Sequence, residues 1–114
     1  MKISVERKDL LRAMSRAQAI VERRTTIPIL SNVLIEARED NLTLRATDLD
    51  IELLDSVKAV VEKEGAVTVG AHTFYDILRK VPDGSRVLID LDPLNQKINV
   101  KAGRSTFSLT TISV

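Results

Sequence analysis

The sequence contains no cysteine and no tryptophan, and only 3% of its residues are aromatic. Without cysteine the chain has no disulfides, no thiolate metal ligands and no cysteine nucleophile. One tyrosine and two phenylalanines predict an aliphatic core and are too few to stack against single-stranded nucleic acid. The opening segment MKISVERKDL lacks the apolar stretch of a signal sequence, and nothing approaches the length of a transmembrane helix. We therefore expect a cytoplasmic protein that makes no membrane contact.

The rest of the composition is that of one ordinary domain. A chain of 114 residues is long enough for a single modest core, so we expect one domain over residues 1–114. Hydrophobic residues make up 44% and charged residues 29%, as in typical globular proteins. The formal net charge is only +1. Binding to a polyanion would therefore require the positive charges to be sorted onto one surface.

The sequence shows no catalytic arrangement of side chains. His72 is the only histidine, and no nearby serine or second histidine accompanies it to form a nucleophile and base. The four glycines are scattered and form no phosphate-binding loop. We therefore expect no enzymatic activity, no catalytic residue and no cofactor. A small hydrolase is a remote alternative.

Three carboxylates alternate at Asp48, Asp50 and Glu52, and in an extended segment they would share one face. A calcium loop of the EF-hand type needs glycine at its sixth position, which Leu53 occupies here. We interpret these carboxylates as solubilising charges on an outer sheet face and expect no metal site. Metal occupancy after a soak with divalent cations would revive the hydrolase alternative.

The first half of the chain reads as strand, helix and three strands. Apolar alternation predicts a strand at residues 3–5, and a helical period without Gly or Pro predicts a helix over residues 7–22. Two alternating segments, 33–37 and 42–46, flank a turn and predict a β-hairpin. A third strand follows over residues 51–61, with Ile51, Leu53, Val57, Ala59 and Val61 on one face.

The second half repeats this order. We expect strands at residues 67–69, 87–91, 98–100 and 107–109, and a shorter helix over 74–81 that ends at Pro82. An offset of 64 residues pairs Ile3 with Val67 and Leu10 with Phe74, which suggests an internal duplication with halves at about 1–62 and 63–114. The predicted fold class is α+β, a duplicated β-α-β-β-β unit. Its two helices lie side by side on antiparallel sheet, with their polar faces on one side.

Basic residues gather on one face of the first helix. At 100° per residue, Lys8, Arg12, Arg16 and Arg23 fall within about a quarter of its circumference, and Arg24 follows in the connection. The second helix offers a weaker and more mixed set, with His72, Asp76, Arg79 and Lys80 as the exposed candidates. This arrangement suits contact with DNA phosphates and lacks the side chains of a base-reading helix. The alternative is an ordinary solvated helix face.

Five segments of the chain resemble, in order, landmarks of the first domain of the bacterial DNA sliding clamp, the β subunit of DNA polymerase III. They are MKISVERKDLL, RRTTIPILSNVLIEA, LTLRATDLDIEL, GAVTVGAHTFYDILRKVPDG and KAGRSTFSLTT. The resemblance extends from residue 1 to about residue 111. It implies the first of three similar clamp domains in a longer chain. Two such chains close head to tail into a ring that encircles duplex DNA, with helices lining the pore and sheet outside.

The resemblance also implies roles for individual residues. Arg24 matches a family position that contacts DNA in the pore, while His72 and Thr73 stand where family members often carry Arg or Lys. The remaining pore-lining candidates, taken from their positions on the helices, are Arg7, Lys8, Arg12, Arg16, Arg23, Arg79 and Lys80.

A second set matches the edge at which the first domain meets the third domain of the partner chain. Phe107 and Leu109 would supply apolar contact there, and Lys97 and Arg104 would supply charge pairs. Thr106 replaces a position that is frequently basic, which removes one ion pair. The alternative for Phe107 and Leu109 is plain strand core. We expect residues 104–110 to form an open sheet edge that invites association.

The implied function is that of a non-catalytic processivity factor in DNA replication. It would hold duplex DNA by enclosure and by sequence-independent attraction, and it would need no cofactor and no metal. DNA polymerase III and the clamp loader would dock on domains other than this one. The chain stops at Ile112-Ser113-Val114, where the family usually continues through a linker, so we expect an isolated domain. The alternative is an interaction module on the clamp fold that never encircles DNA.

Overall fold

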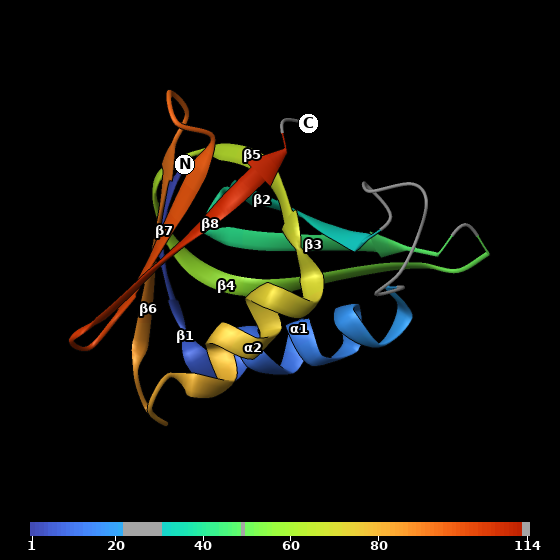
Figure 1. The fold of residues 1–114 in the computed structure, drawn as a ribbon, viewed down its shortest axis with the longest axis horizontal. Coiled ribbons are helices and arrows are strands. Elements are labelled where there is room, and N and C mark those ends of the chain that lie inside the picture. Colours follow the sequence, from blue (N-terminus) through green and yellow to red (C-terminus); the bar gives the residue numbers. More distant parts are fainter. Residues whose placement is uncertain (22–30, 49, 113–114) are drawn as a thin grey trace.

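The computed structural model describes residues 1–21, 31–48 and 50–112, in which two helices lie on one side of eight antiparallel strands (Figure 1). The order along the chain is strand, helix and three strands, twice over. The elements are β1 (Lys2–Glu6), α1 (Arg7–Ile20), β2 (Asn32–Arg38), β3 (Asn41–Thr47), β4 (Glu52–Lys63), β5 (Gly65–Gly70), α2 (Ala71–Lys80), β6 (Arg86–Asp92), β7 (Lys97–Ala102) and β8 (Ser105–Ile112). The predicted α+β class and the repeated unit are confirmed.

Each helix buries one apolar stripe against the sheet. In α1 the buried positions are Leu10, Ala13, Met14 and Ala17, which recur every three or four residues as the helical period requires. α1 ends at Ile20, two residues before the predicted end. The next residue, Val21, is extended, with φ −86° and ψ 130°, and its side chain is only 4% exposed. The chain therefore leaves the helix at Val21 and places this β-branched side chain in the core.

α2 is shorter and also buries one apolar stripe against the sheet. Ala71, Phe74 and Leu78 are buried, and Phe74 is fully enclosed. The helix ends because Val81 precedes Pro82, and a residue before proline disfavours the helical conformation. The turn that follows contains Gly84 with φ +77°, a left-handed conformation that suits glycine.

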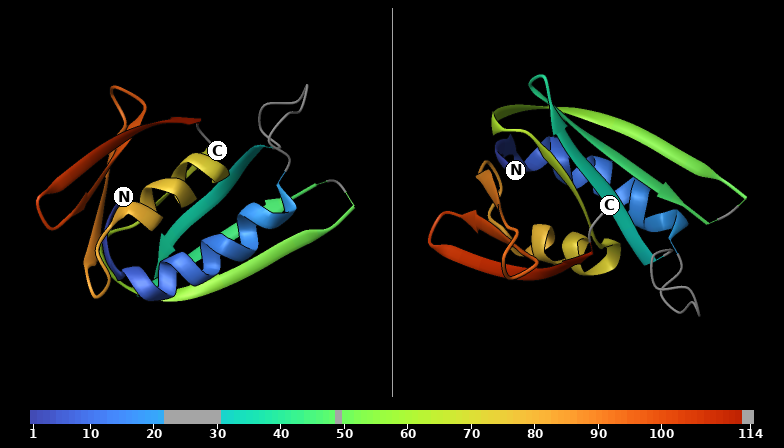
Figure 2. Two further views of the ribbon diagram at one scale, coloured as in Figure 1. Left: turned by 60° about the horizontal axis from the view of Figure 1, so that its bottom comes forward. Right: turned by 90° about the horizontal axis from the view of Figure 1, so that it is seen from above.

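The two helices run side by side in opposite directions (Figure 2). Two side-chain hydrogen bonds show this pairing. Nε of Arg7, at the start of α1, donates to the Leu78 carbonyl near the end of α2 at 3.1 Å. The Val21 carbonyl, just after α1, accepts from Nε2 of His72 in the first turn of α2 at 2.8 Å. Both polar helix faces consequently point to the same side of the molecule, as the sequence predicts.

The strand order is β1-β4-β3-β2-β5-β8-β7-β6, and β6 closes back on β1. The first strand of each half pairs with strands of both halves. β1 pairs with β6 of the second half, from Lys2↔Asp90 to Glu6↔Arg86, and β5 pairs with β2 of the first half. Neither half can complete its sheet without the other, so the predicted halves are repeats within one folding unit.

The two longest stretches of strand that are paired on one side only, within the part of the chain that the structure describes, lie on β8 and β4. β8 pairs with β7 over residues 105–110, and only Thr111 and Ile112 reach β5. β4 pairs with β3 over residues 52–58, and β1 takes over from residue 59. The expected open edge is thus confirmed for residues 105–110. An equivalent edge exists on β4.

The core between helices and sheet is aliphatic apart from Phe74. Inward-facing positions alternate along the strands, as the period of two predicts. Ile51 is an exception, because it lies just before β4 and is 56% exposed instead of facing inward. No helix in the described ranges is long and apolar enough to cross a membrane.

Candidate nucleic-acid interface

The outward face of α1 carries a row of basic side chains. Lys8, Arg12 and Arg16 are spaced by four residues, so their side chains stand one above another on the helix surface. All three residues are exposed, and the side chains of Arg12 and Arg16 are 61% and 52% accessible. We call Lys8, Arg12 and Arg16, together with Arg79 and Lys80 of α2, the basic face.

α2 adds two cations in its last turn, Arg79 and Lys80, which are both exposed. The Arg79 guanidinium carbon lies 5.1 Å from the centre of the Tyr75 ring, a cation–π contact. Arg79 also donates to Asp76 at 3.1 Å. Because α2 lies beside α1, these residues extend the basic face across both helices.

A groove of about 490 Å³ runs along this side, between the helices. Its lining combines the apolar Leu11 and Tyr75 with cationic side chains. It is lined by Arg7, Lys8, Leu11, Arg12, Ser15, Arg16, Tyr75, Asp83 and Gly84. An open groove with four cations in its lining suits a polyanion backbone better than it suits a small ligand, which needs an enclosed pocket.

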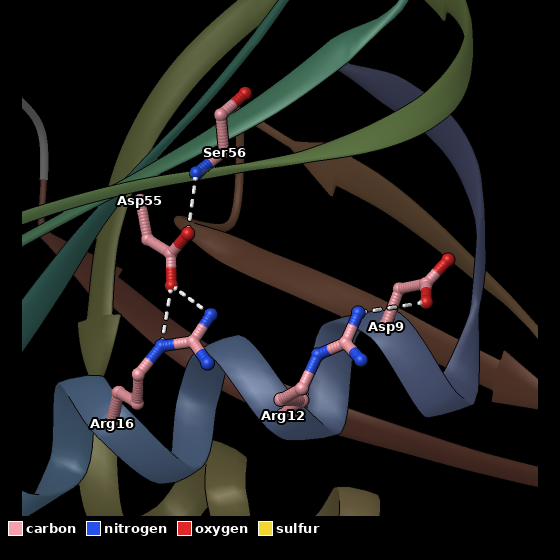
Figure 3. Close-up of polar contacts among 5 residues, drawn as sticks. All are labelled: Asp9, Arg12, Arg16, Asp55 and Ser56. Atoms are coloured by element: carbon pink, nitrogen blue, oxygen red, sulfur yellow. Dashed lines mark hydrogen bonds and ion pairs between the residues drawn. The ribbon is translucent and has the colours of Figure 1, made fainter.

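Carboxylates accompany the arginines of the basic face. Arg12 Nη2 lies 3.4 Å from Asp9 Oδ1, a pair within one helical turn (Figure 3). Arg16 reaches across to β4, where its Nε and Nη2 donate to Asp55 Oδ2 at 2.9 and 2.6 Å (Figure 3). Among the described residues, Lys8 and Lys80 have no such partner. The two lysines are therefore the uncompensated charges of the basic face.

Sequence reasoning missed Asp55. The inward alternation of β4 passes through Leu53, Asp55 and Val57, all partly buried, so Asp55 stands on the helix-facing side. An acidic residue in the middle of an apolar alternation, opposite a basic helix face, was the signal that could have revealed it.

Arg7 has a different environment from the other predicted DNA contacts. Its side chain is only 12% exposed, and it donates to the Leu78 carbonyl and to Asp83, the latter at 2.5 Å. The structure therefore shows Arg7 as a link between the two helices, with little surface to offer a phosphate. Its role in DNA contact stays a prediction.

His72 and Thr73 lie in the first turn of α2, and Thr73 is exposed. The His72 ring is held by Val21 through Nε2, while its buried Nδ1 has no hydrogen-bond partner among the described residues. His72 thus joins the two helices at this end. The other two predicted contacts, Arg23 and Arg24, lie outside the described residues.

The predicted dimer-edge residues are spread along the β7–β8 hairpin, with Lys97 and Arg104 at opposite ends of it. Lys97 and Arg104 are exposed, at the start of β7 and in the turn before β8. Phe107 is half-buried and packs against the core, and Leu109 is only 5% exposed. Leu109 is therefore a core side chain in this domain, the alternative left open for it. Contact between this edge and a second chain stays a prediction.

The alternating carboxylates after β3 do not form the outer-face row that the sequence suggested. Oδ1 of Asp48 accepts from the backbone N–H groups of Ile51 at 2.7 Å and Asp50 at 2.9 Å. These hydrogen bonds hold the pKa of Asp48 below its ordinary value, because they stabilise the ionised form. Asp48 is thus a turn-forming residue between β3 and β4.

Comparisons with known proteins agree on one family. A family model described as DNA polymerase III beta subunit, N-terminal domain, matches residues 1–114. The chain is 45% identical over 112 residues to the beta sliding clamp of Caulobacter vibrioides, and 40% identical over 113 residues to that of Pseudomonas putida. In both cases 98% of this chain is covered.

A solved structure titled Caulobacter crescentus pol III beta superposes with a TM-score of 0.96 and 44% identity. That match covers 100% of this chain and 31% of the other. The chain spans about 30% of the length of the curated relatives it matches.

Proposed function

Because this chain belongs to the family of the DNA polymerase III beta subunit, N-terminal domain, we propose that it acts as one domain of a DNA sliding clamp. The relatives it matches are named beta sliding clamp. In this proposal the protein is a non-catalytic processivity factor of replication that works in the cytoplasm. It holds duplex DNA through enclosure and through weak attraction to phosphates.

The observation that carries the proposal is the basic face. Two antiparallel helices present Lys8, Arg12, Arg16, Arg79 and Lys80 on one side of the domain, and the sheet occupies the other side. Long cationic side chains can follow a phosphate backbone without reading bases, since phosphate contacts carry no sequence information. A surface of this kind attracts any duplex and still allows the duplex to move along it.

The two open edges support a place in a ring. We propose that the edge of β8, with Lys97, Arg104 and Phe107 near it, meets a domain of a second chain, and that the edge of β4 meets a neighbouring domain. Unpaired strand edges are natural sites for association, because their backbone groups lack partners. DNA polymerase III and the clamp loader would bind other domains of the full-length protein.

DNA binding tests the proposal. We expect weak binding to a duplex of about 30 base pairs, equal for two unrelated sequences, and falling steeply between about 50 and 200 mM salt. Fluorescence anisotropy across a salt series measures all three properties. Binding that persists at high salt, or that prefers one sequence, would contradict the proposal.

A pair of charge reversals locates the surface. Lys8→Glu with Lys80→Glu removes the uncompensated cations of the basic face, and we expect it to weaken binding strongly. Lys63→Glu with Lys101→Glu changes the net charge equally on exposed strand positions and should leave most of the binding intact. Equal effects of the two pairs would show that DNA does not use the basic face. That result would favour the alternative, an interaction module that never encircles DNA.

A further inference from the structure

Asp55 is an acidic side chain built into the support of the basic face. It lies on the inward side of β4, between the half-buried Leu53 and Val57, and its side chain is only 19% exposed. A carboxylate at such a position loses much of its hydration, so it is stable there only with close partners. The structure supplies two of them, one backbone N–H and one guanidinium.

The Asp55 carboxylate is held in place by its own strand, independently of Arg16. Oδ1 accepts from the backbone N–H of Ser56 at 2.9 Å, which holds the carboxylate against its own strand. Oδ2 then accepts from both Nε and Nη2 of Arg16, at 2.9 and 2.6 Å (Figure 3). The arginine is the longer and more exposed partner, so the carboxylate determines where the guanidinium rests.

This pair occupies one of the two donor edges of the guanidinium, the one formed by Nε and Nη2. Arginine binds an oxyanion best through two parallel N–H donors, and the Nε and Nη2 donors of Arg16 already point at Asp55. The Arg16 side chain is 52% exposed, so DNA can approach it. An approaching phosphate meets a pair whose net charge is zero, with a carboxylate close behind the cation.

The same compensation recurs at every arginine of the two described helices. Asp9 pairs with Arg12, Asp76 with Arg79 and Asp83 with Arg7, each within 3.4 Å. The partners of Arg12 and Arg79 lie one turn away on the same helix, where such pairs are common. Asp55 comes from another element and is the most buried of these carboxylates. Its position is therefore determined by the fold and not by helix geometry alone.

We propose that Asp55 is an internal counterion that withholds Arg16 from DNA phosphates and so keeps the attraction of the basic face weak. This inference rests on the proposed function, since it assigns a residue that limits DNA binding on the same surface. A clamp must hold a duplex and still let it slide. Each extra phosphate contact raises the affinity for DNA and steepens its dependence on salt concentration. The opposite role is that Asp55 positions Arg16 to contact DNA.

Asp55→Asn separates the two roles. Asparagine keeps the size of the side chain and an acceptor for Ser56, and removes the charge. We expect duplex affinity to rise roughly threefold, the scale of one partly exposed ion pair. We also expect the slope of log affinity against log salt to become more negative by about 0.9, the value for one added phosphate contact. Unchanged or weaker binding would overturn the proposal.

Two further variants make the result specific. Asp90→Asn changes the net charge equally at an exposed position on β6 and should change affinity by much less. In an Arg16→Gln background, Asp55→Asn should lose most of its effect, because the cation that it releases is gone. An equal gain with and without Arg16 would show a general charge effect and would contradict the proposal.

The outcomes distinguish this inference from the function on which it rests. If the unmodified chain binds no duplex at low salt, the proposed function fails for this domain. If it binds, and reversal of Lys8 and Lys80 weakens it, but Asp55→Asn adds nothing, only the role of Asp55 fails. Circular dichroism and urea unfolding of each variant confirm that the fold is retained. Should Asp55→Asn unfold, Asp76→Asn at the exposed Arg79 pair tests compensation instead, and unchanged affinity there would likewise count against it.

Discussion

At the scale of single residues, the structure divides similar cations into different roles. Arg7 and Arg12 both belong to α1, but the Arg7 side chain is 12% exposed and that of Arg12 is 61% exposed. Arg7 donates to a backbone carbonyl of the other helix as well as to Asp83. A hydrogen bond from a charged group to a half-buried acceptor contributes more to stability than an exposed ion pair does.

Arg7→Ala should therefore destabilise the fold, because it leaves the Leu78 carbonyl without its donor and removes a link between the helices. We expect the free energy of unfolding to fall by about 1–3 kcal/mol, measured by urea denaturation. Arg12→Ala, the control on the same helix, should cost no more than about 0.5 kcal/mol. Similar losses for the two variants would contradict the assigned roles.

Asp48 gives the fold a defined acid sensitivity. Hydrogen bonds from the Ile51 and Asp50 N–H groups lower the pKa of this carboxyl in the folded state. A group with a depressed folded-state pKa contributes stability that is fully present above its unfolded-state pKa and is lost as pH falls through the folded-state pKa. Asp48→Asn removes the titrating group. The free energy of unfolding of this variant should therefore decline less than that of the parent chain between about pH 5 and about pH 2. Thermal unfolding at several pH values measures the difference.

At the scale of elements, the helices are attached by their buried stripes and not by the basic face. Leu78 of α2 is fully buried among core residues, whereas Leu94, in the turn between β6 and β7, is 93% exposed. The same truncation at the two positions therefore separates core packing from surface effects.

Leu78→Ala removes apolar contacts and leaves a cavity beneath α2, so we expect a loss of about 2–5 kcal/mol in the free energy of unfolding. Leu94→Ala should change it by less than about 0.5 kcal/mol. Denaturant unfolding followed by circular dichroism measures both. A small loss for Leu78→Ala would mean that α2 is not anchored as the structure shows.

At the scale of the whole molecule, the closed strand order conceals two open edges. β8 is unpaired on one side over residues 105–110, and β4 is unpaired over 52–58, within the described residues. These edges belong to equivalent strands of the two repeats. One domain therefore offers two different edges, which suits head-to-tail association better than association through one shared surface.

The edge of β8 makes self-association of this chain measurable. We expect the sedimentation coefficient to rise with protein concentration, and Phe107→Asp to suppress that rise, because a charge would enter the edge. Arg104→Glu tests the same edge from an exposed turn and leaves the core intact. Leu88→Asp is the control, since Leu88 is exposed on β6, a strand paired on both sides. If neither edge variant alters association, the β8 edge is not the contact.

Local patterns in the sequence were sufficient for the elements and for the basic face. The apolar alternation of the strands and the three-to-four-residue period of the helices depend on near neighbours, so both could be read before any fold was known. The same holds for the Pro82 turn and for the spacing of Lys8, Arg12 and Arg16. The resemblance to the sliding-clamp family rested on short segments taken in order, and the family comparisons confirmed it.

Only the tertiary structure decided which distant residues meet. Positions far apart in the chain are joined by the pairing of β1 with β6, by the Arg16–Asp55 pair and by the Arg7–Asp83 pair. No local period encodes such contacts, because they depend on how the sheet closes and how the helices settle on it. The sequence by itself therefore determined where the cations lie on α1. The fold determined that Arg16 has a carboxylate partner, that Arg7 is a structural link and that Lys8 remains available.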